Sequence, residues 1–346
     1  MRVALLAPDA AVWHDTLARV PHDFYHLPSY VALSAAHEGG EARAVYVEDG
    51  GCRLLLPLVI REAGDGIRDG TSPYGYPGSL VSGPPAFARR AWAALHERLR
   101  ADRLVALFVR LHPLLDPEPP ESAGLVVEHG ETVSVDLAQS PEELWRQTAS
   151  GHRNEINRSR RAGHTASIDE RWERLSAFVR LYRATMQRRG AAASYLFPDA
   201  YFEGLREALG DRMRLAVVEI GGVVAAAGLF VETAGIVQYH LSATDDAFVR
   251  ERPTKLLLHF VRGWAKERGN RRLHLGGGLG GRPDALFRFK AGFSHARHPF
   301  RTLRVVLDAA AYEARVRACD PALDPARLDG FFPLYRGPIA AATAHP

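Results

Sequence analysis

The chain has 346 residues, which is enough to bury a sizeable core and favours two domains. Hydrophobic residues make up 47% and charged residues 24% of the sequence, the proportions of an ordinary soluble globular protein. The formal net charge is only +4, although the sequence pI is about 9.2, so a nucleic-acid role would depend on local clusters of charge.

The first part of the sequence predicts alternating helices and strands. Its strongest signal is a hairpin, because Asp49-Gly50-Gly51 joins two β-rich runs, Ala42–Glu48 and Cys52–Ile60. The other predicted elements are a helix opening near Pro28, a turn-rich loop at 70–78 leading into Ser79–Ser82, a helix within Ala86–Arg100 and a buried strand at Leu104–Leu111.

The second part of the sequence opens with an alternating strand at Thr132–Leu137. A capping box at Ser140 and Glu143 then predicts a helix that runs to Arg161. Gly221-Gly222 predicts a second hairpin. The remaining predicted elements are helices over Glu170–Arg189, Pro198–Leu209 and Pro253–Arg268, and strands over Arg214–Ile220, Val223–Glu232, Ile236–Ser242, Arg271–Leu275 and Leu303–Asp308.

An internal repeat indicates the architecture. VEDGGCRLLLPL at Val47–Leu58 aligns with VEIGGVVAAAGL at Val218–Leu229, and each copy is followed by a strand, a helix and a strand. The fold class predicted is α/β, with a mixed sheet covered by helices. We expect an N-terminal domain at 1–130, a C-terminal domain at 131–310 and a tail at 311–346 that is a helix and then a loose end. The alternative is one large α/β domain with coincidental hairpins.

The cysteine pattern and the hydropathy pattern bear on where in the cell the protein is located. Cys52 and Cys319 are far apart and share no metal-type spacing, so neither a disulfide framework nor a metal site is expected. There is no run of about 18 apolar residues and no signal-peptide pattern. We therefore expect a cytoplasmic protein with no membrane span, peripheral membrane contact being left open.

The stretch Arg271–Phe293 is the most informative part of the chain. It predicts a strand, a glycine-rich bend and a short helix with Pro283 at its first position and Asp284 in its first turn. Of the 44 basic residues only three are lysine, and Lys290 lies on this helix among phenylalanines. A compact ammonium differs chemically from a guanidinium fork, so Lys290 is a candidate functional residue.

The predicted order resembles the GNAT acyltransferase fold, and two such halves in tandem resemble the Fem family of aminoacyl-tRNA-dependent peptidyltransferases. The segments that carry the likeness are DGTSPYGYPGSLVSG at 69–83, GHRNEINRSRRAG at 151–163, YRATMQRRGA at 182–191, HLSAT at 240–244 and LHLGGG…LFRFKAGF at 273–293. The chain lacks the long coiled-coil insertion of some members.

The resemblance implies transfer of an amino acid from aminoacyl-tRNA to an amine of a peptidoglycan precursor or a natural-product intermediate. Phe289 would line the channel for the terminal adenosine, and Lys290 would stabilise the oxyanion of the reacting ester. In such a transfer, negative charge develops on the carbonyl oxygen, and a fixed donor lowers the barrier. No general base is assigned; Asp69, His152 and His240 are candidates, and proton transfer to substrate or water is the alternative.

Two basic segments are candidates for binding RNA. Ordinary GNAT enzymes hold coenzyme A on a glycine-rich loop, whereas the corresponding loop here has no glycine and contains Pro253, which removes a donor. Solvated surface charge is the alternative for both segments. The candidate tRNA-binding residues are Arg250, Arg252 and Lys255 on this loop, and Arg153, Arg160 and Arg161 on the helix end 152–161.

The remaining candidates would bind substrate. Asn154 and Arg158 would lie nearest the site, and Tyr74 and Tyr76 would hydrogen-bond or stack on the acceptor; a turn packed by its own aromatics is the alternative for the tyrosines. Tyr239 and His240 end a predicted strand that faces the bend; His240 would line the site, and a buried, hydrogen-bonded histidine is the alternative. Gly277 most simply allows close backbone approach, and a binding role is secondary.

No cofactor is expected, aminoacyl-tRNA being the co-substrate, and DNA is not an expected partner. One alternative function is an acyl-CoA-dependent GNAT N-acyltransferase, the only scheme that requires coenzyme A. The other is a non-catalytic protein that binds tRNA or a cell-wall precursor.

Overall fold

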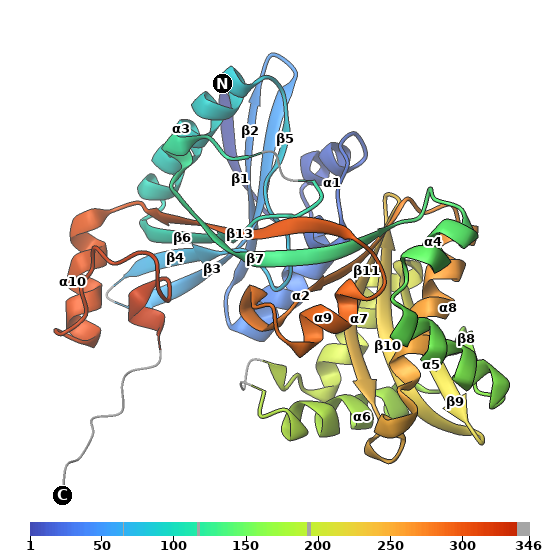
Figure 1. Cartoon of the computed structure of the whole chain (residues 1–346). Coiled ribbons are helices and arrows are strands. Elements are labelled where there is room, and N and C mark those ends of the chain that lie inside the picture. The colour runs from blue at the N-terminus through green and yellow to red at the C-terminus, as the bar shows by residue number, and fades with distance from the viewer. Residues whose placement is uncertain (65, 116–117, 192–194, 338–346) are drawn as a thin grey trace, which may run out of the picture. The chain divides into compact units, whose positions relative to one another are not determined.

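The computed structural model describes residues 1–346 except for 65, 116–117, 192–194 and 338–346 (Figure 1). The chain forms two units, Met1–His129 with Phe300–Pro346, and Gly130–Pro299. It leaves the first unit within β7 (Leu125–Asp136) and returns within β13 (Ala296–Val306). Residues 300–310, expected in the second domain, therefore belong to the first unit, because the second half of β13 pairs with β6.

The first unit is a mixed sheet in the order β1-β2-β3-β4-β6-β13, with β5 paired to β3. Leucines and valines of β2, β3 and β6 pack against Phe87, Trp92 and Leu95 of α3, while α2 packs on β2 and β3. The strands are β1 (Arg2–Leu6), β2 (Glu41–Asp49), β3 (Cys52–Gly64), β4 (Ile67–Thr71), β5 (Leu80–Ser82) and β6 (Leu104–Arg110). The helices are α1 (Ala11–Leu17), α2 (Pro28–Glu38), α3 (Pro85–Ala101) and α10 (Ala309–Cys319), with short 3₁₀ turns η1 (Phe24–His26), η2 (Glu121–Ala123) and η7 (Leu334–Arg336).

The second unit is a mixed sheet in the order β7-β12-β11-β10-β9-β8. One buried core unites this sheet with α4, α5, α8 and α9, and α6 packs on β10 and β11. The strands are β8 (Thr165–Ile168), β9 (Met213–Ile220), β10 (Val223–Thr233), β11 (Ile236–Thr244) and β12 (Arg272–Gly277). The helices are α4 (Pro141–Gln147), α5 (Ser150–Arg161), α6 (Leu175–Arg188), α7 (Asp199–Leu209), α8 (Pro253–Glu267) and α9 (Ala285–Ala291), with η4 (Gly210–Arg212), η5 (Asp246–Glu251) and η6 (Leu279–Gly281).

Both units contain the predicted order of hairpin, strand, helix and strand, although in the first unit the strand parallel to β6 is β4 and not the predicted Ser79–Ser82, which pairs with β3 as β5. In the first, the β2–β3 hairpin is followed by β4, α3 and β6, with β4 parallel to β6; in the second, the β9–β10 hairpin is followed by β11, α8 and β12, with β11 parallel to β12. A parallel pair needs a crossover, which the helix supplies. Both hairpin turns use left-handed glycines, with φ of 57° and 85° at Gly50 and Gly51, and of 59° and 80° at Gly221 and Gly222.

The helix predicted from Ser140 to Arg161 is in fact two helices, α4 and α5. The capping box at Ser140 is present, but Thr148 and Ala149 are extended, with ψ of 126° and 141°. The buried guanidinium of Arg262 donates to the Leu144 carbonyl oxygen and to Thr148 Oγ1 at 3.1 and 2.8 Å, which stabilises the free carbonyl end of α4. A distant side chain therefore ends the helix where local pattern predicts continuation.

The start of α9 also differs from the prediction. Asp284 is the N-cap, not a first-turn residue, and Pro283 precedes the helix. Strands β1, β4 and β8 were not predicted from the sequence. No helix among the described residues is long and apolar enough to span a membrane.

Candidate active site

Lys290 is a buried lysine on the last turn of α9. The residue is only 9% exposed. Nζ donates a hydrogen bond to the carbonyl oxygen of Gly277 at 2.7 Å and lies 5.9 Å from the centre of the Tyr239 ring. Burial lowers the pKa of Lys290 to about 8, and the Asp284 carboxylate opposes part of this shift. An ammonium held in this way is a fixed donor with a pKa close to neutral pH, a combination typical of functional lysines.

The strands beside Lys290 separate at this point. β11 and β12 are paired in register only from Ile236–Arg272 to Gln238–His274. After this paired stretch, each strand has a register shift with its other neighbour. The pairing of β11 with β10 skips His240, and the pairing of β12 with β7 skips Leu275. Gly277 follows this irregularity, and a Cβ there would lie 2.7 Å from the Glu131 carbonyl oxygen. Glycine therefore permits the close backbone approach that the sequence predicted.

Tyr239 and His240 occupy the irregular part of β11. The Tyr239 ring stacks on Phe230, with centroids 5.3 Å apart, and its hydroxyl hydrogen-bonds Ser242 Oγ. Burial raises the pKa of Tyr239 to about 12, so this ring stays neutral beside the ammonium. Burial lowers the pKa of His240 to about 3, which makes His240 a neutral and weak base near neutral pH.

The C-terminal end of α9 is held by α5. His152 Nε2 donates to the Phe289 carbonyl oxygen at 2.9 Å, and its ring lies 5.6 Å from Phe289 and 4.8 Å from Phe293. The backbone N–H of Ala149 donates to the Gly292 carbonyl oxygen at 2.8 Å. Burial lowers the pKa of His152, so the imidazole is a neutral structural contact.

The predicted tRNA-binding residues fall into groups with different surroundings. Glu155 on α5 pairs with Arg158 at 2.8 Å and with Arg252 at 3.8 Å, and Arg158 Nη2 donates to the Arg250 carbonyl oxygen at 3.2 Å. Lys255 belongs to the same cluster; burial lowers its pKa, and Glu155 opposes the shift. The structure thus brings α5 and the segment before α8 together.

Arg153 has a different environment from the other α5 arginines. Its Nη1 lies within hydrogen-bond distance of the carbonyl oxygens of Trp145, Arg146 and Thr148, at the C-terminal end of α4. It therefore acts with Arg262 as a C-cap. A residue committed to three backbone oxygens is poorly placed to bind phosphate.

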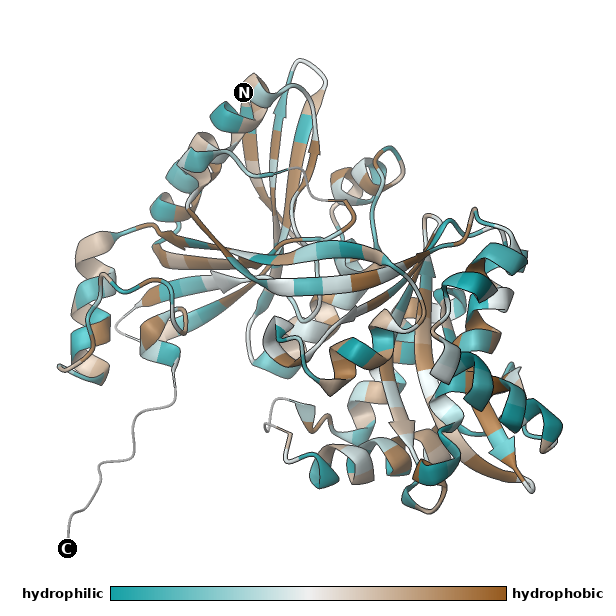
Figure 2. Cartoon of the chain, in the orientation of Figure 1, coloured by the Kyte–Doolittle hydropathy of each residue, from teal (hydrophilic) through white to brown (hydrophobic). Residues whose placement is uncertain are grey.

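The exposed face of α5 retains two arginines without an ion pair among the described residues. Arg160 and Arg161 line a hollow together with Asn154 and Asn157. Figure 2 shows that α5 is strongly hydrophilic, whereas the strands of its unit are largely hydrophobic. Amide and guanidinium groups that face solvent in one hollow suit a polar anionic ligand.

Tyr74 and Tyr76 lie in the first unit. The Tyr74 carbonyl oxygen accepts from the Tyr30 hydroxyl at 2.7 Å, and the Tyr76 ring meets the rings of Phe300 and Tyr25 edge-on at 5.5 and 6.0 Å. Gly75 between them has a φ of 111° and directly abuts the Tyr25 ring. The loop is therefore ordered by its aromatic contacts.

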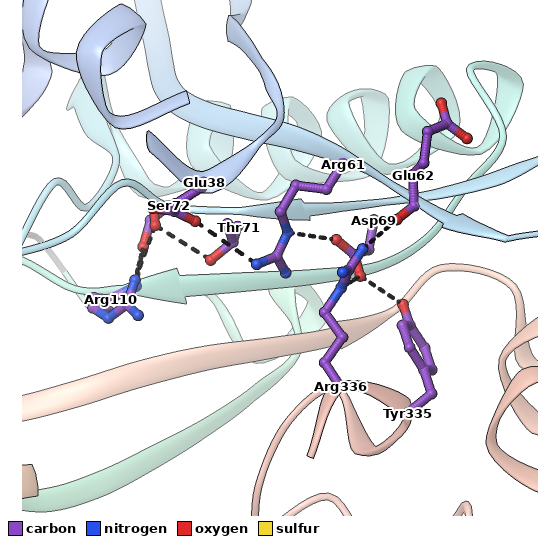
Figure 3. Close-up of polar contacts among 9 residues, drawn as sticks. All are labelled: Glu38, Arg61, Glu62, Asp69, Thr71, Ser72, Arg110, Tyr335 and Arg336. Carbon is purple, nitrogen blue, oxygen red and sulfur yellow. Dashed lines mark hydrogen bonds and ion pairs between the residues drawn. The ribbon is translucent and has the colours of Figure 1, made fainter. Parts of the chain in front are cut away.

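Asp69, a candidate general base, is fully buried in the first unit (Figure 3). Its carboxylate accepts from Arg61 Nε at 3.0 Å, from the Tyr335 hydroxyl at 3.1 Å and from Arg336. These contacts attach the segment Leu334–Arg336 to β3 and β4. Two guanidiniums on one carboxylate make Asp69 a structural anchor.

Sequence reasoning missed several residues that shape this site. Glu155 appeared only as the single acid of a basic helix, His152 only as a candidate base, and Asp284 only as a first-turn acid. Pro283 predicts a helix start two residues too early, because proline suits both the first helical position and the position before an N-cap. Among the described residues, no group of three or more His, Cys, Asp or Glu could hold a metal ion.

Comparisons with known proteins bear on the fold. Residues 147–290 match the family model described as an acetyltransferase (GNAT) domain. This match and the repeated element order show a GNAT-type acyltransferase fold, a mixed α/β architecture of two GNAT-like units, as predicted.

Solved structures extend the likeness to most of the chain. FemX has a TM-score of 0.68 at 14% identity, covering 91% of this chain and 99% of its own. The C-terminal domain of a putative lysylphosphatidylglycerol synthetase from Agrobacterium fabrum has a TM-score of 0.54 at 15% identity, covering 90% and 96%. L-PGS from Bacillus licheniformis has a TM-score of 0.53 at 15% identity, covering 86% and 91%. The predicted resemblance to the Fem fold is confirmed, whereas no curated protein matches the sequence.

Proposed function

We propose that the chain is an aminoacyltransferase that moves an amino acid from aminoacyl-tRNA to an amine. The observation that carries the proposal is the Lys290 ammonium, buried where β11 and β12 part and bonded to the Gly277 carbonyl oxygen. The GNAT-type acyltransferase fold and the fold likeness to FemX support the same class of reaction.

The reaction forms one amide bond and breaks one ester bond. The acceptor nitrogen attacks the ester carbonyl carbon, and the carbonyl oxygen gains negative charge in the tetrahedral intermediate. The intermediate collapses to the amide, and the ribose oxygen leaves with one proton while the amine loses one. Lys290 donates to the oxyanion; a fixed donor of this kind lowers the barrier by about 3–4 kcal/mol. Phe289, beside His152, would line the path of the terminal adenosine.

The aminoacyl-tRNA would bind to the second unit, because the candidate phosphate-binding arginines and Lys255 lie there. Arg160 and Arg161, with Asn154, would contact phosphates from the hollow on α5. Arg250, Arg252 and Lys255 would contact them near the start of α8, where Arg158 and Glu155 fix their positions. Tyr74 and Tyr76 of the first unit remain the predicted acceptor contacts.

The segment at the start of α8 is poorly suited to binding coenzyme A. A pyrophosphate cradle needs successive backbone N–H groups, but Pro253 at the start of α8 has none, and Arg252 before it is left-handed with a φ of 51°. An acyl-CoA-dependent reaction remains the second candidate, because residues 147–290 match an acetyltransferase domain. Titration calorimetry with coenzyme A separates the two, tight binding favouring the second.

The direct test incubates the protein with a pool of radiolabelled aminoacyl-tRNAs and candidate acceptors. The acceptors should include amine-bearing peptidoglycan precursors and natural-product intermediates, with phosphatidylglycerol as a non-amine comparison. We expect transfer to an amine that stops after ribonuclease treatment. Ribonuclease-insensitive transfer would remove tRNA from the scheme, and tRNA binding without transfer to any acceptor would favour a non-catalytic binding protein.

A further inference from the structure

Asp284 connects the two segments that enclose the Lys290 ammonium. One carboxylate oxygen, Oδ1, accepts from the backbone N–H of Phe287 in α9 at 2.9 Å. The other, Oδ2, accepts from the backbone N–H of Leu279 in the glycine-rich bend at 3.0 Å. A single side chain thus fixes the start of α9 relative to the end of β12.

The packing around Asp284 leaves little freedom. A Cβ on Gly278 would lie 2.5 Å from Asp284 Oδ1, so the carboxylate lies directly against the backbone of the bend. Only Gly278 lies between Leu279, which donates to Asp284, and Gly277, whose carbonyl oxygen accepts from Lys290. Asp284 therefore fixes both the helix that carries the ammonium and the backbone that receives it.

Asp284 is the acidic group whose charge acts on the Lys290 ammonium. The ionisable groups near the ammonium are Asp284 from the α9 N-cap, Tyr239 from β11 and, beyond Phe289, His152 from α5. Tyr239 and His152 are neutral, because burial raises the pKa of the first and lowers that of the second. The negative charge of Asp284 raises the pKa of the buried amine and so opposes part of the effect of burial.

We propose that Asp284 is the positioning residue for Lys290: its carboxylate holds the glycine bend and α9 together and places the Lys290 ammonium at the strand opening. Its catalytic meaning depends on the proposed function, whereas the placement itself does not. An ammonium misplaced by about 1 Å can lose roughly 100-fold in rate.

The chain offers a direct spectroscopic test, because it contains only three lysines. Protein labelled with ¹³C,¹⁵N-lysine gives three side-chain signals, and the Lys290→Met variant assigns one of them. Asp284→Asn removes the charge and one of the two acceptors, while Asp284→Ser keeps an N-cap without charge. Asp308→Asn is the matched control, because Asp308 caps α10 in the first unit by accepting from Ala311 N at 3.0 Å.

In both Asp284 variants we expect the Lys290 signal to shift and to titrate at a lower pH than in the wild type. It should be unchanged in Asp308→Asn. In the transfer assay, the Asp284 variants should lose about 10- to 100-fold in kcat with little change in KM. An unmoved Lys290 signal in folded Asp284→Asn and Asp284→Ser would overturn the proposal. Absence of transfer in the wild type would instead overturn the proposed function, because the signal is read without substrate.

Discussion

The ammonium of Lys290 and the carbonyl oxygen of Gly277 are 2.7 Å apart, and they join the last turn of α9 to the end of β12. The contact is made where β12 has left β11, so the ammonium lies at an opening of the sheet. Burying a lysine ammonium is unfavourable unless nearby groups compensate its charge. Here the Gly277 carbonyl oxygen accepts a hydrogen bond from it, and the Asp284 carboxylate opposes part of the burial effect. Such an arrangement is more readily explained by chemistry than by stability.

The first prediction concerns the pH dependence of stability. The pKa of Lys290 is about 8 in the native protein and takes the ordinary value of 10.5 when unfolded. Between these values the unfolded chain binds more protons, so raising the pH stabilises the native state, and lowering the pH through 8 removes this contribution. Relative to Lys290→Met, the wild type should gain about 3 kcal/mol over this interval. Urea titrations of both proteins measure the gain; parallel pH profiles would rule out a lowered lysine pKa.

The second prediction concerns the contact between α5 and α9. A Cβ on Gly292 would lie 2.5 Å from His152 Nε2, so Gly292→Ala should displace the imidazole from the Phe289 carbonyl oxygen. We expect a loss of about 1–3 kcal/mol in the free energy of unfolding. Gly263→Ala on α8 is the control, because nothing lies within 4 Å of its added Cβ. The control should gain about 0.5–1 kcal/mol. Equal effects of both variants would show that His152 does not hold α9.

The third prediction separates two kinds of arginine on α5. Arg160→Gln with Arg161→Gln should weaken tRNA binding and flatten its salt dependence, by about 0.7–0.9 in log–log slope for each phosphate that is no longer neutralised. Thermal stability should be unchanged, because these side chains face the hollow. Arg153→Gln should instead destabilise the protein and leave the salt dependence of tRNA binding unchanged, because the Arg153 guanidinium caps α4. Filter binding at several salt concentrations measures tRNA affinity, and melting curves measure stability. Equal changes in affinity and stability at all three positions would contradict this division.

The fourth prediction concerns the anchor in Figure 3. Asp69→Asn leaves Arg61 and Arg336 without their shared buried carboxylate, and breaking a buried pair costs about 3–5 kcal/mol. Asp102→Asn, which breaks the partly exposed pair with Arg98 at 2.7 Å, should cost no more than about 1 kcal/mol. Chemical denaturation compares the two. A small effect of Asp69→Asn on stability with a complete loss of transfer would favour Asp69 as a base instead of an anchor.

Features that depend on neighbouring residues could be predicted from the sequence. Asp49-Gly50-Gly51 and Gly221-Gly222 determine their turns locally, and Ser140 with Glu143 forms its capping box without outside help. The repeat of these local signals was enough to predict two related halves. Lys290 was identified because lysine is rare in this chain.

Features that depend on distant contacts could not be predicted. The break between α4 and α5 is made by Arg262, and the role of Arg153 follows from that break. The attachment of Arg336 to Asp69 joins residues that lie 267 positions apart in the sequence. In the sequence, the arginines of α5 look alike. Only the packing shows that Arg153 caps α4, that Arg158 forms an ion pair with Glu155, and that Arg160 and Arg161 face solvent.

The most direct test of the account measures single-turnover amide formation from aminoacyl-tRNA by wild type, Lys290→Met and Lys266→Met. Lys266 is a matched control in the same unit, since its Nζ also donates to a backbone oxygen, that of Leu137, at 2.8 Å. Loss of one oxyanion donor should slow Lys290→Met by roughly 100- to 1,000-fold, with Lys266→Met close to wild type. A folded Lys290→Met protein that transfers at the wild-type rate would contradict the central role of this ammonium.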